Sequence, residues 1–464
     1  MAAPALSISK SSVNKHKYLL LQSQNYSSVL SPLKCTQRIK YTCFDISQSF
    51  LLFGATSGGL YVFRREPCSF LQLLPNKEGA VCKVSISPDE KLIAFASVRG
   101  VVCVLSRSES GGCATRCLNR SVEHNGSEVT ALCWVATSDQ LFVGDKQGRL
   151  SVINVPIFMS KNIFNVPAFV FMQLDSGVVQ VCSHGERLLV STLTRCYVCD
   201  TEKEQYRQVG SKLREGEYGA CYFGKDQVKI FCARPGSRLW EVDDDGVVKS
   251  THQFKQALAK QPSFLVQNSG ENNNIIFSEL HESSWPEQSF NFAKLSVFLD
   301  KYLFTFKQDG IYIFDPEEVD VVLWSNCFQD IIDAKCFEDI VYIFTSNSEI
   351  HALAVLTIEK CLLKLYFQKD YELCLDLCLK LASTLMQSTA MMSKLSPLLG
   401  LKSHISDYGH DLLILFDQIE KYSREKENAL QLDSGIFLIE NHHLCLKQLN
   451  DQNDETLNSE KQKN

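Results

Sequence analysis

The stretches ERLLVSTLTRCYVCDTEKEQYRQVGSKLREGEYGACYF (residues 186–223) and KIFCARPGSRLWEVDDDGVVKSTHQFK (229–255) decide the fold. In both, apolar and β-branched residues alternate over short runs that are interrupted by Gly, Asp and Arg. This alternation is typical of antiparallel strands joined by tight turns. The same pattern extends from the first part of the chain to about residue 356, which predicts a repeat of short paired strands.

Seven copies of a strand–turn–strand pattern occur, at 51–63, 91–105, 140–155, 186–200, 229–242, 301–315 and 339–353. Five of the six intervals between turns lie near the roughly 40–50 residue period of a four-stranded propeller blade. Each copy is expected to form the inner two strands of a blade, after an outer pair that includes 80–87 or 128–134. The pattern therefore predicts a mainly β fold, a seven-bladed WD-repeat-like β-propeller at 1–356.

Two segments depart from the strand repeat. The longest interval contains an Asn-rich stretch at about 261–290, which is interpreted as a looped insertion between blades. From residue 357 apolar residues recur at helical spacing, with stripes that begin at Ile358 and Tyr371 and a turn between them. Residues 357–448 are predicted to be a helical hairpin that starts a short α-solenoid-like segment, and 449–464 a disordered tail.

Composition limits the classes of function. The net charge of −6 comes from 47 basic and 53 acidic residues, without a basic run suited to nucleic acid or to a membrane surface. The sequence shows no secretory signal and no apolar run long enough to cross a bilayer, so a cytoplasmic (cytosolic) location without direct membrane insertion is expected. The 19 cysteines are then expected to be reduced, and many of them buried.

Two near matches to ligand-binding loops fail on chemistry. Residues 219–226 resemble a phosphate-binding loop, but Asp226 replaces the hydroxyl that would hold Mg²⁺, and the four residues after Gly219 resemble a strand. Asp243, Asp244 and Asp245 resemble the start of a calcium loop, but His252 stands where the bidentate glutamate is needed. A plain turn between strands is the preferred interpretation of the second segment.

Other candidate metal ligands lack partners at the right spacing. His281 and Glu282 begin a metalloprotease-like motif whose second histidine is replaced by Trp285. Two cysteine pairs, Cys196 with Cys199 and Cys374 with Cys378, are interpreted as core residues. A small cluster near the end of the chain, His442, His443 and Cys445, is interpreted as surface. No Ser/His/Asp arrangement is evident, so no catalytic, cofactor-binding or metal-binding residue is assigned and the partner-binding residues stay unassigned.

Three arginines at predicted turns leave two alternatives open. Arg195, Arg234 and Arg238 are expected to be exposed, either as ligands for an acidic partner or, preferably, as solvated side chains. The sequence alone does not decide between a partner ligand and a solvated side chain.

Several segments resemble the Hermansky–Pudlak syndrome type 5 protein family. They are VTALCW (129–134), LFVGDKQGRLS (141–151), LLVSTLTRCYVCDTEKE (188–204), GEYGACYF (216–223), CARPGSRLWEV (232–242), STHQFK (250–255), GIYIF (310–314) and DSGIFLI (433–439). The resemblance covers roughly residues 35 to 440. It is specific because the segments 232–242 and 194–204 are not general propeller sequence. The family continues through a long helical and acidic region, so the chain is expected to be a fragment, a short isoform or an incomplete gene product.

The resemblance implies a non-enzymatic subunit of the biogenesis of lysosome-related organelles complex two. It implies the type 3 and type 6 proteins as partners, Rab-family small GTPases upstream, and peripheral association with early endosomes. The implied role is delivery of cargo to melanosomes, pigment granules and dense granules. One alternative is an autophagy-linked scaffold of the tectonin-repeat type. The other is a propeller-fold enzyme, which needs polar residues around the central channel that the sequence does not reveal.

Trp134, Trp240 and Trp324 lie in or beside predicted strands and are expected in the core of the blades. The substitution Trp240→Ala is therefore expected to lower the free energy of unfolding by about 3–5 kcal/mol. Thermal melting of the variant beside the wild type measures this, and an unchanged melting curve would contradict the assignment.

Overall fold

The computed structural model describes residues 18–24, 26–34, 38–107, 116–155, 168–224, 227–259, 263, 265–268, 273–276, 288–407 and 410–433. The chain divides into two compact units, Met1–Thr357 and Ile358–Asn464. No helix among the described residues is long and apolar enough to cross a membrane.

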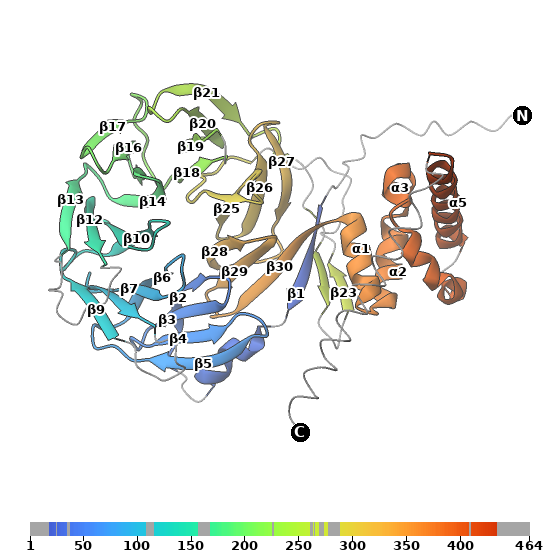
Figure 1. The fold of residues 1–464 in the computed structure, drawn as a ribbon, viewed down its shortest axis with the longest axis horizontal. Coiled ribbons are helices and arrows are strands. Elements are labelled where there is room, and N and C mark those ends of the chain that lie inside the picture. The colour runs from blue at the N-terminus through green and yellow to red at the C-terminus, as the bar shows by residue number, and fades with distance from the viewer. Residues whose placement is uncertain are drawn as a thin grey trace, which may run out of the picture. The chain divides into compact units, whose positions relative to one another are not determined.

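Seven mainly antiparallel sheets, blades 1 to 7, surround a common centre (Figure 1). Blade 1 contains β2 (Tyr41–Ile46), β3 (Phe50–Ala55), β4 (Leu60–Arg64) and β5 (Ser69–Leu74), and blade 2 contains β6 (Val81–Ile86), β7 (Leu92–Ser97), β8 (Val102–Ser106) and β9 (Arg116–Ser121). Blade 3 contains β10 (Val129–Trp134), β11 (Gln140–Asp145), β12 (Arg149–Asn154) and β13 (Phe169–Gln173). The prediction of a seven-bladed β-propeller followed by helices is confirmed.

The remaining blades keep the same strand order. Blade 4 contains β14 (Val178–His184), β15 (Arg187–Thr192), β16 (Cys196–Asp200) and β17 (Gln205–Gln208), and blade 5 contains β18 (Ala220–Phe223), β19 (Lys229–Arg234), β20 (Arg238–Val242) and β21 (Val248–Gln253). Blade 6 contains β24 (Ser296–Phe298), β25 (Tyr302–Lys307), β26 (Gly310–Asp315) and β27 (Asp320–Ser325). Blade 7 contains β28 (Ile331–Phe337), β29 (Ile340–Thr345) and β30 (Ile350–Thr357).

The first strand of each blade lies nearest the centre, and these seven strands contact one another in a closed ring. The seven predicted hairpins are the second and third strands of their blades. The prediction that they were the inner pair, preceded by an outer pair, was wrong. Segments 81–86 and 129–134 are the innermost strands β6 and β10, which contact each other and the first strands of blades 1 and 4.

Blade 7 is completed by strands from distant parts of the chain. The strand β1 (Tyr18–Gln24) pairs antiparallel with β30, and β22 (Leu265–Asn268) pairs in parallel with β1 (Figure 1). β22 in turn pairs with β23 (Asn273–Ile276). The predicted looped insertion at 261–290 therefore contains two strands, which extend blade 7 instead of blades 5 or 6, its neighbours in sequence.

Apolar side chains from adjacent blades form the core. Between blades 6 and 7, Leu20 of β1 and Leu265 of β22 are both fully buried with Ile343 and Leu353. Trp134 and Trp324 are buried as predicted, but Trp240 is only partly buried. The Arg234 guanidinium lies over its ring, with its centre 4.0 Å from the ring centroid, and the ring edge approaches Gly210. The expected cost of Trp240→Ala consequently falls below that of a core tryptophan.

The second unit is helical. It contains α1 (Ile358–Phe367), α2 (Tyr371–Lys380), α3 (Ala382–Met386), α4 (Thr389–Met392), a 3₁₀ segment η2 (Ser396–Asp407) and α5 (His410–Asp433). α1 and α2 form the predicted hairpin, with Lys369 at a φ of 66° in the turn. Cys374 and Cys378 are buried on α2, which confirms their interpretation as core.

Closure of the ring through β1 makes a testable prediction. Leu20→Ala removes a fully buried side chain at the closing strand and is expected to lower the free energy of unfolding by about 2–5 kcal/mol. Leu71→Ala, on the exposed face of the edge strand β5, is the matched control and should change it by about 0.5 kcal/mol or less. Urea unfolding measures both; equal midpoints would show that β1 contributes nothing to closure.

Candidate functional site

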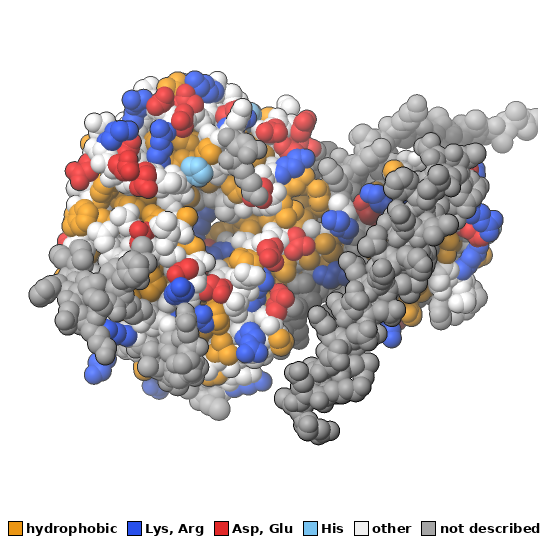
Figure 2. Space-filling view, in the orientation of Figure 1, with side chains coloured by type: hydrophobic (Ala, Val, Ile, Leu, Met, Phe, Trp, Pro, Cys, Tyr) orange, Lys and Arg blue, Asp and Glu red, His pale blue; other side chains and the backbone are white. Residues whose placement is uncertain are grey.

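The central channel contains a cluster of charged side chains that sequence analysis missed. Asp45 lies on β2, Lys83 on β6, and Asp333 and Lys335 on β28, while Lys294 precedes β24. Figure 2 shows the ring hollowed at its centre. The signal was present in the sequence as charged residues inside otherwise apolar strand runs, but it is recognisable only when the innermost strands are known.

Four of the five channel charges form ion pairs between blades. Lys294 Nζ lies 2.7 Å from Asp333 Oδ1, and Lys335 Nζ lies 2.6 Å from Asp45 Oδ1. These pairs join blade 6 to blade 7 and blade 7 to blade 1. Lys83 makes no ion pair with any residue that the structure describes. The cluster therefore contributes to the closure of the ring and leaves one free ammonium group.

Burial and the neighbouring charges shift the pKa values of three members of the channel cluster. Burial favours the neutral acid of Asp333, but Lys294 and Lys335 outweigh it and hold the pKa of Asp333 below its usual value. Burial acts to lower the pKa of Lys335, yet Asp45 and Asp333 raise it. Burial lowers the pKa of Lys294 despite its pairing with Asp333.

A cavity of about 250 Å³ adjoins this cluster. Its lining combines the polar side chains of Gln180, Lys294, Asp333 and Lys335 with the rings of Phe304 and Phe306. Gln180 is also held in place, because its amide nitrogen donates to the Leu295 carbonyl and its amide oxygen accepts from the Leu295 backbone N–H. Each of these polar groups already has a partner, since Lys294 pairs with Asp333, Lys335 with Asp45, and Gln180 with the Leu295 backbone, so the cavity presents little free chemistry.

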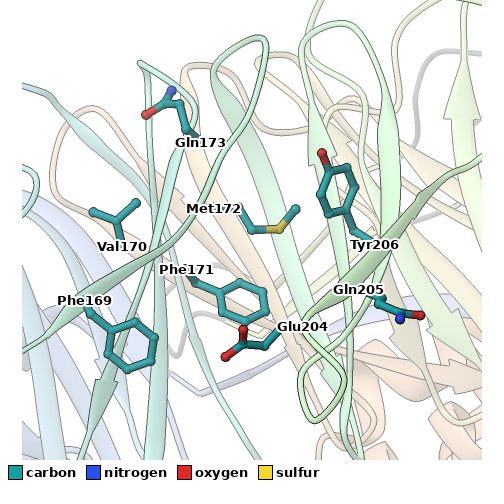
Figure 3. A pocket seen from close by; sticks show the side chains of 8 residues that line it. All are labelled: Phe169, Val170, Phe171, Met172, Gln173, Glu204, Gln205 and Tyr206. Carbon is teal, nitrogen blue, oxygen red and sulfur yellow. The ribbon is translucent and has the colours of Figure 1, made fainter.

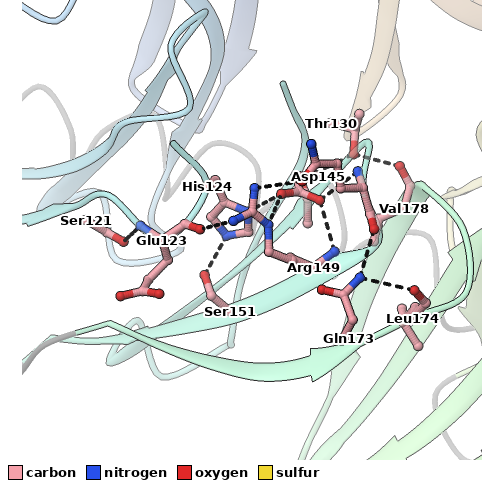
Figure 4. A network of polar contacts seen from close by, with 12 residues as sticks. Ser121, Glu123, His124, Thr130, Asp145, Arg149, Ser151, Gln173, Leu174 and Val178 are labelled. Carbon is pink, nitrogen blue, oxygen red and sulfur yellow. Dashed lines mark hydrogen bonds and ion pairs between the residues drawn. The ribbon is translucent and has the colours of Figure 1, made fainter. Parts of the chain in front are cut away.

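A Ser/His/Asp arrangement is present, although sequence analysis found none. His124 Nδ1 lies 2.9 Å from Asp145 Oδ2, and His124 Nε2 lies 2.7 Å from Ser151 Oγ (Figure 4). Asp145 also accepts from the backbone N–H groups of Gln147 and Arg149 and from the Arg149 side chain. The three residues come from the loop after β9, the end of β11 and β12, an association that only the folded blade creates.

Burial shows that this arrangement supports the fold. His124, Asp145 and Ser151 are each 0% exposed, so no substrate reaches the hydroxyl. Burial lowers the pKa of His124 although Asp145 opposes this, while His124 and Arg149 overcome burial to lower the pKa of Asp145. A neutral imidazole that joins a buried carboxylate to a buried hydroxyl satisfies three groups that would otherwise be costly to bury.

The outer edges of blades 3 and 4 form a groove. It has a volume of about 420 Å³ and is lined by residues 169–173 of β13 and 204–206 at β17 (Figure 3). Phe169 is 46% exposed, Val170 43% and Tyr206 63%. The groove combines these exposed apolar side chains with the polar side chains of Gln173, Glu204 and Gln205. It lies at the outer edge of two neighbouring sheets, a position suited to contact with another protein.

The remaining predicted candidates are distributed over the propeller. Residues 220–223 after Gly219 form strand β18 as expected, and the Asp243–Asp245 segment is a turn in which Asp243 accepts from the Asp245 and Val247 N–H groups. Cys196 and Cys199 are buried on β16, as interpreted. Among the described residues no group of three or more His, Cys, Asp or Glu side chains is placed to hold a metal ion.

Four candidates lie outside the described residues: Asp226, the pair His281–Glu282, the cluster His442, His443 and Cys445, and the tail 449–464. The arginines differ from one another. Arg195 pairs with Asp175, and Arg238 is exposed. Arg234 is only 8% exposed, so its expected exposure was wrong, because its guanidinium stacks on Trp240 and donates to the Leu213 carbonyl.

The fold and these sites define a WD-repeat-like β-propeller protein with an attached helical unit. A family model described as HPS5 beta-propeller matches residues 20–347. The chain therefore belongs to the HPS5 family, which confirms the resemblance inferred from its sequence.

Curated relatives agree with this assignment. The BLOC-2 complex member HPS5 homolog of Drosophila melanogaster is 35% identical over 414 residues, 87% of this chain and 50% of the relative. BLOC-2 complex member HPS5 of Homo sapiens is 31% identical over 454 residues, 91% of this chain and 39% of the relative. Tectonin beta-propeller repeat-containing protein 2 of Homo sapiens is 25% identical over 329 residues, which are 67% of this chain and 22% of the relative. The chain spans half or less of the length of these relatives.

The buried histidine makes a prediction about pH. Because its pKa is lowered on folding, the unfolded state binds more protons at His124 once the pH falls below its unfolded pKa of about 6.5. Stability should therefore decline from pH 7 to pH 5. Burial also lowers the pKa of His351, so this histidine adds to the decline in stability. His124→Ala should lower the free energy of unfolding by about 2–4 kcal/mol and make this decline shallower.

Chemical unfolding at several pH values measures both effects. Val98→Ala, at an exposed position without a titratable group, is the control and should keep the wild-type slope. A His124→Ala variant as stable and as pH-dependent as the wild type would contradict a structural role for the network.

Proposed function

We propose that the chain is a non-enzymatic scaffold subunit of BLOC-2, the biogenesis of lysosome-related organelles complex two. Membership of the HPS5 family over residues 20–347 is the observation that carries the proposal. Two relatives of 31–35% identity bear the name of BLOC-2 complex members. In this role the chain contributes to cargo delivery from early endosomes to melanosomes, pigment granules and dense granules.

The proposal includes partners and a location. The type 3 and type 6 Hermansky–Pudlak syndrome proteins are the proposed partner subunits, with Rab-family small GTPases upstream. The chain acts in the cytosol and reaches early endosomes through these partners. Residues 1–356 serve as the propeller domain and 357–448 as the start of a helical solenoid.

The polar sites favour a binding role over catalysis. The His124 network is fully buried, and in the channel cluster four of the five charges are paired with one another. The groove between blades 3 and 4 instead offers exposed apolar side chains, which suit a protein partner. We take this groove as the surface that contacts another subunit of the complex.

A pull-down tests the proposal and the surface together. The tagged chain, incubated with cytosol, is expected to recover the type 3 and type 6 proteins, identified by mass spectrometry. Tyr206→Glu places a charge on the most exposed aromatic ring of the groove and should reduce recovery by about tenfold. Val98→Glu, an exposed position in blade 2, is the control and should leave recovery unchanged.

The outcomes separate the alternatives. If the wild type and Tyr206→Glu recover both proteins equally, membership of the complex is supported but the groove is not part of the interface. Recovery of ubiquitin-like autophagy proteins in their place would favour the tectonin-type scaffold. If the folded chain recovers neither partner while a full-length HPS5 protein does, this segment is insufficient for assembly and the proposal is wrong for it.

A further inference from the structure

Four basic side chains meet at one end of blade 5, at the turn between β19 and β20. Arg234 and Arg238 are direct cross-strand neighbours on either side of the Pro235–Ser237 turn. Arg214 comes from the segment before β18, and Lys255 follows β21. We call these four residues the blade 5 basic cluster.

No carboxylate balances this cluster among the residues that the structure describes. The Arg214 side chain donates to the carbonyl oxygens of Ala233 and Arg195 and to Ser191 Oγ. Its Nη2 also lies 2.9 Å from Cys196 Sγ, and the hydrogen bond from Cys232 together with the charge of Arg214 overcomes burial and lowers the pKa of Cys196 to about 6. Arg234 donates to the Leu213 carbonyl, and Arg238 donates to that of Pro235. By contrast, the neighbouring Arg195, Arg187 and Arg207 each have an aspartate partner.

The two arginines of the turn repel each other in the free protein. Arg234 and Arg238 are like charges directly opposite each other on paired strands, an arrangement that is destabilising. Burial and then the positive charges of Arg214 and Arg238 lower the pKa of Arg234, in agreement with a local excess of positive charge. An anionic ligand at the turn would offset this repulsion.

The turn also has a shape suited to a small anionic group. A Cβ placed on Gly236 would lie 3.9 Å from both Lys255 Cε and Ser289 Oγ, and 4.0 Å from Arg238 Nε. An ammonium, a hydroxyl and a guanidinium therefore surround a residue without a side chain. Arg234 is held in a fixed orientation beside them by stacking on Trp240.

We propose that the blade 5 basic cluster binds the carboxylate or phosphate groups of an acidic peptide segment of a partner protein. Arg238 and Lys255 make the contacts with the peptide, because Arg214 and Arg234 are only 3% and 8% exposed. Guanidinium groups recognise both anions in bidentate fashion. Leu213, 58% exposed beside Arg214, provides an apolar contact for a neighbouring side chain of the peptide. This inference does not depend on membership of BLOC-2.

A peptide fits the cluster better than a membrane or a nucleic acid. Glu215 and Glu217 lie in the same connecting segment as Arg214 and would repel an extended anionic surface. The chain as a whole carries a net charge of −6, and only four basic groups gather here. A short acidic segment needs to reach only the two accessible members of the cluster, Arg238 and Lys255.

Fluorescence anisotropy of the whole chain tests the proposal with a labelled Glu-Glu-Leu-Glu-Glu-Leu peptide and a version with phosphoserine in place of two glutamates. Binding by at least one is expected, with weakening as salt increases. The double variant Arg238→Gln with Lys255→Gln should reduce affinity by about tenfold or more. Arg207→Gln, an exposed arginine on β17, is the matched control and should keep wild-type affinity.

Two further measurements keep the test decisive. Arg234→Lys retains the charge but loses the planar stack on Trp240, so its affinity should fall while thermal melting confirms that it is folded. Cosedimentation with phosphatidylcholine–phosphatidylserine vesicles is expected to show no binding. Vesicle binding that the double variant loses, or peptide binding that it keeps, would overturn the proposal.

Discussion

The antiparallel pairing of β1 with β30 is the interaction on which the propeller depends. Every other blade is built from one continuous segment, but blade 7 receives its fourth strand from Tyr18–Gln24, far away in the chain. The pairing brings together two distant segments, so it is formed at a high entropic cost that the burial of Leu19, Leu20 and Leu21 must offset. At the ring centre an ion pair joins the same blade to its other neighbour, since Lys335 of blade 7 meets Asp45 of blade 1.

Buried polar groups in this protein join blades to one another. His124 follows the last strand of blade 2 and bonds to Asp145 and Ser151 of blade 3. Arg214 contacts carbonyl groups from both blade 4 and blade 5. Such directional contacts complement the apolar packing between sheets, which has less power to fix one sheet against the next. Trp240, although only partly buried, contributes to these contacts, because the guanidinium of Arg234 stacks on its ring.

The local sequence predicted each hairpin because alternation within 13 to 16 residues reflects which face of a strand is buried, as in 140–155. It did not predict β1, β22 or β23, whose pairing depends on partners elsewhere in the chain. Dependence on distant partners also explains why the sites were not predicted. Asp45, Lys294 and Lys335 lie far apart in sequence and meet only around the channel, and the burial of Arg234 depends on Trp240 and Leu213. The family resemblance, carried by contiguous segments, was recognisable from the start.

The direct continuation of β30 into α1 has a mechanical consequence. β30 ends at Thr357 and α1 begins at Ile358, so tension applied to the helical unit enters the propeller along the axis of β30. That strand is bonded to β29 on one side and to β1 on the other. A pull along it loads both ladders in shear, where many hydrogen bonds share the force, instead of peeling them one at a time. The propeller is thus anchored to resist traction through its most heavily paired blade.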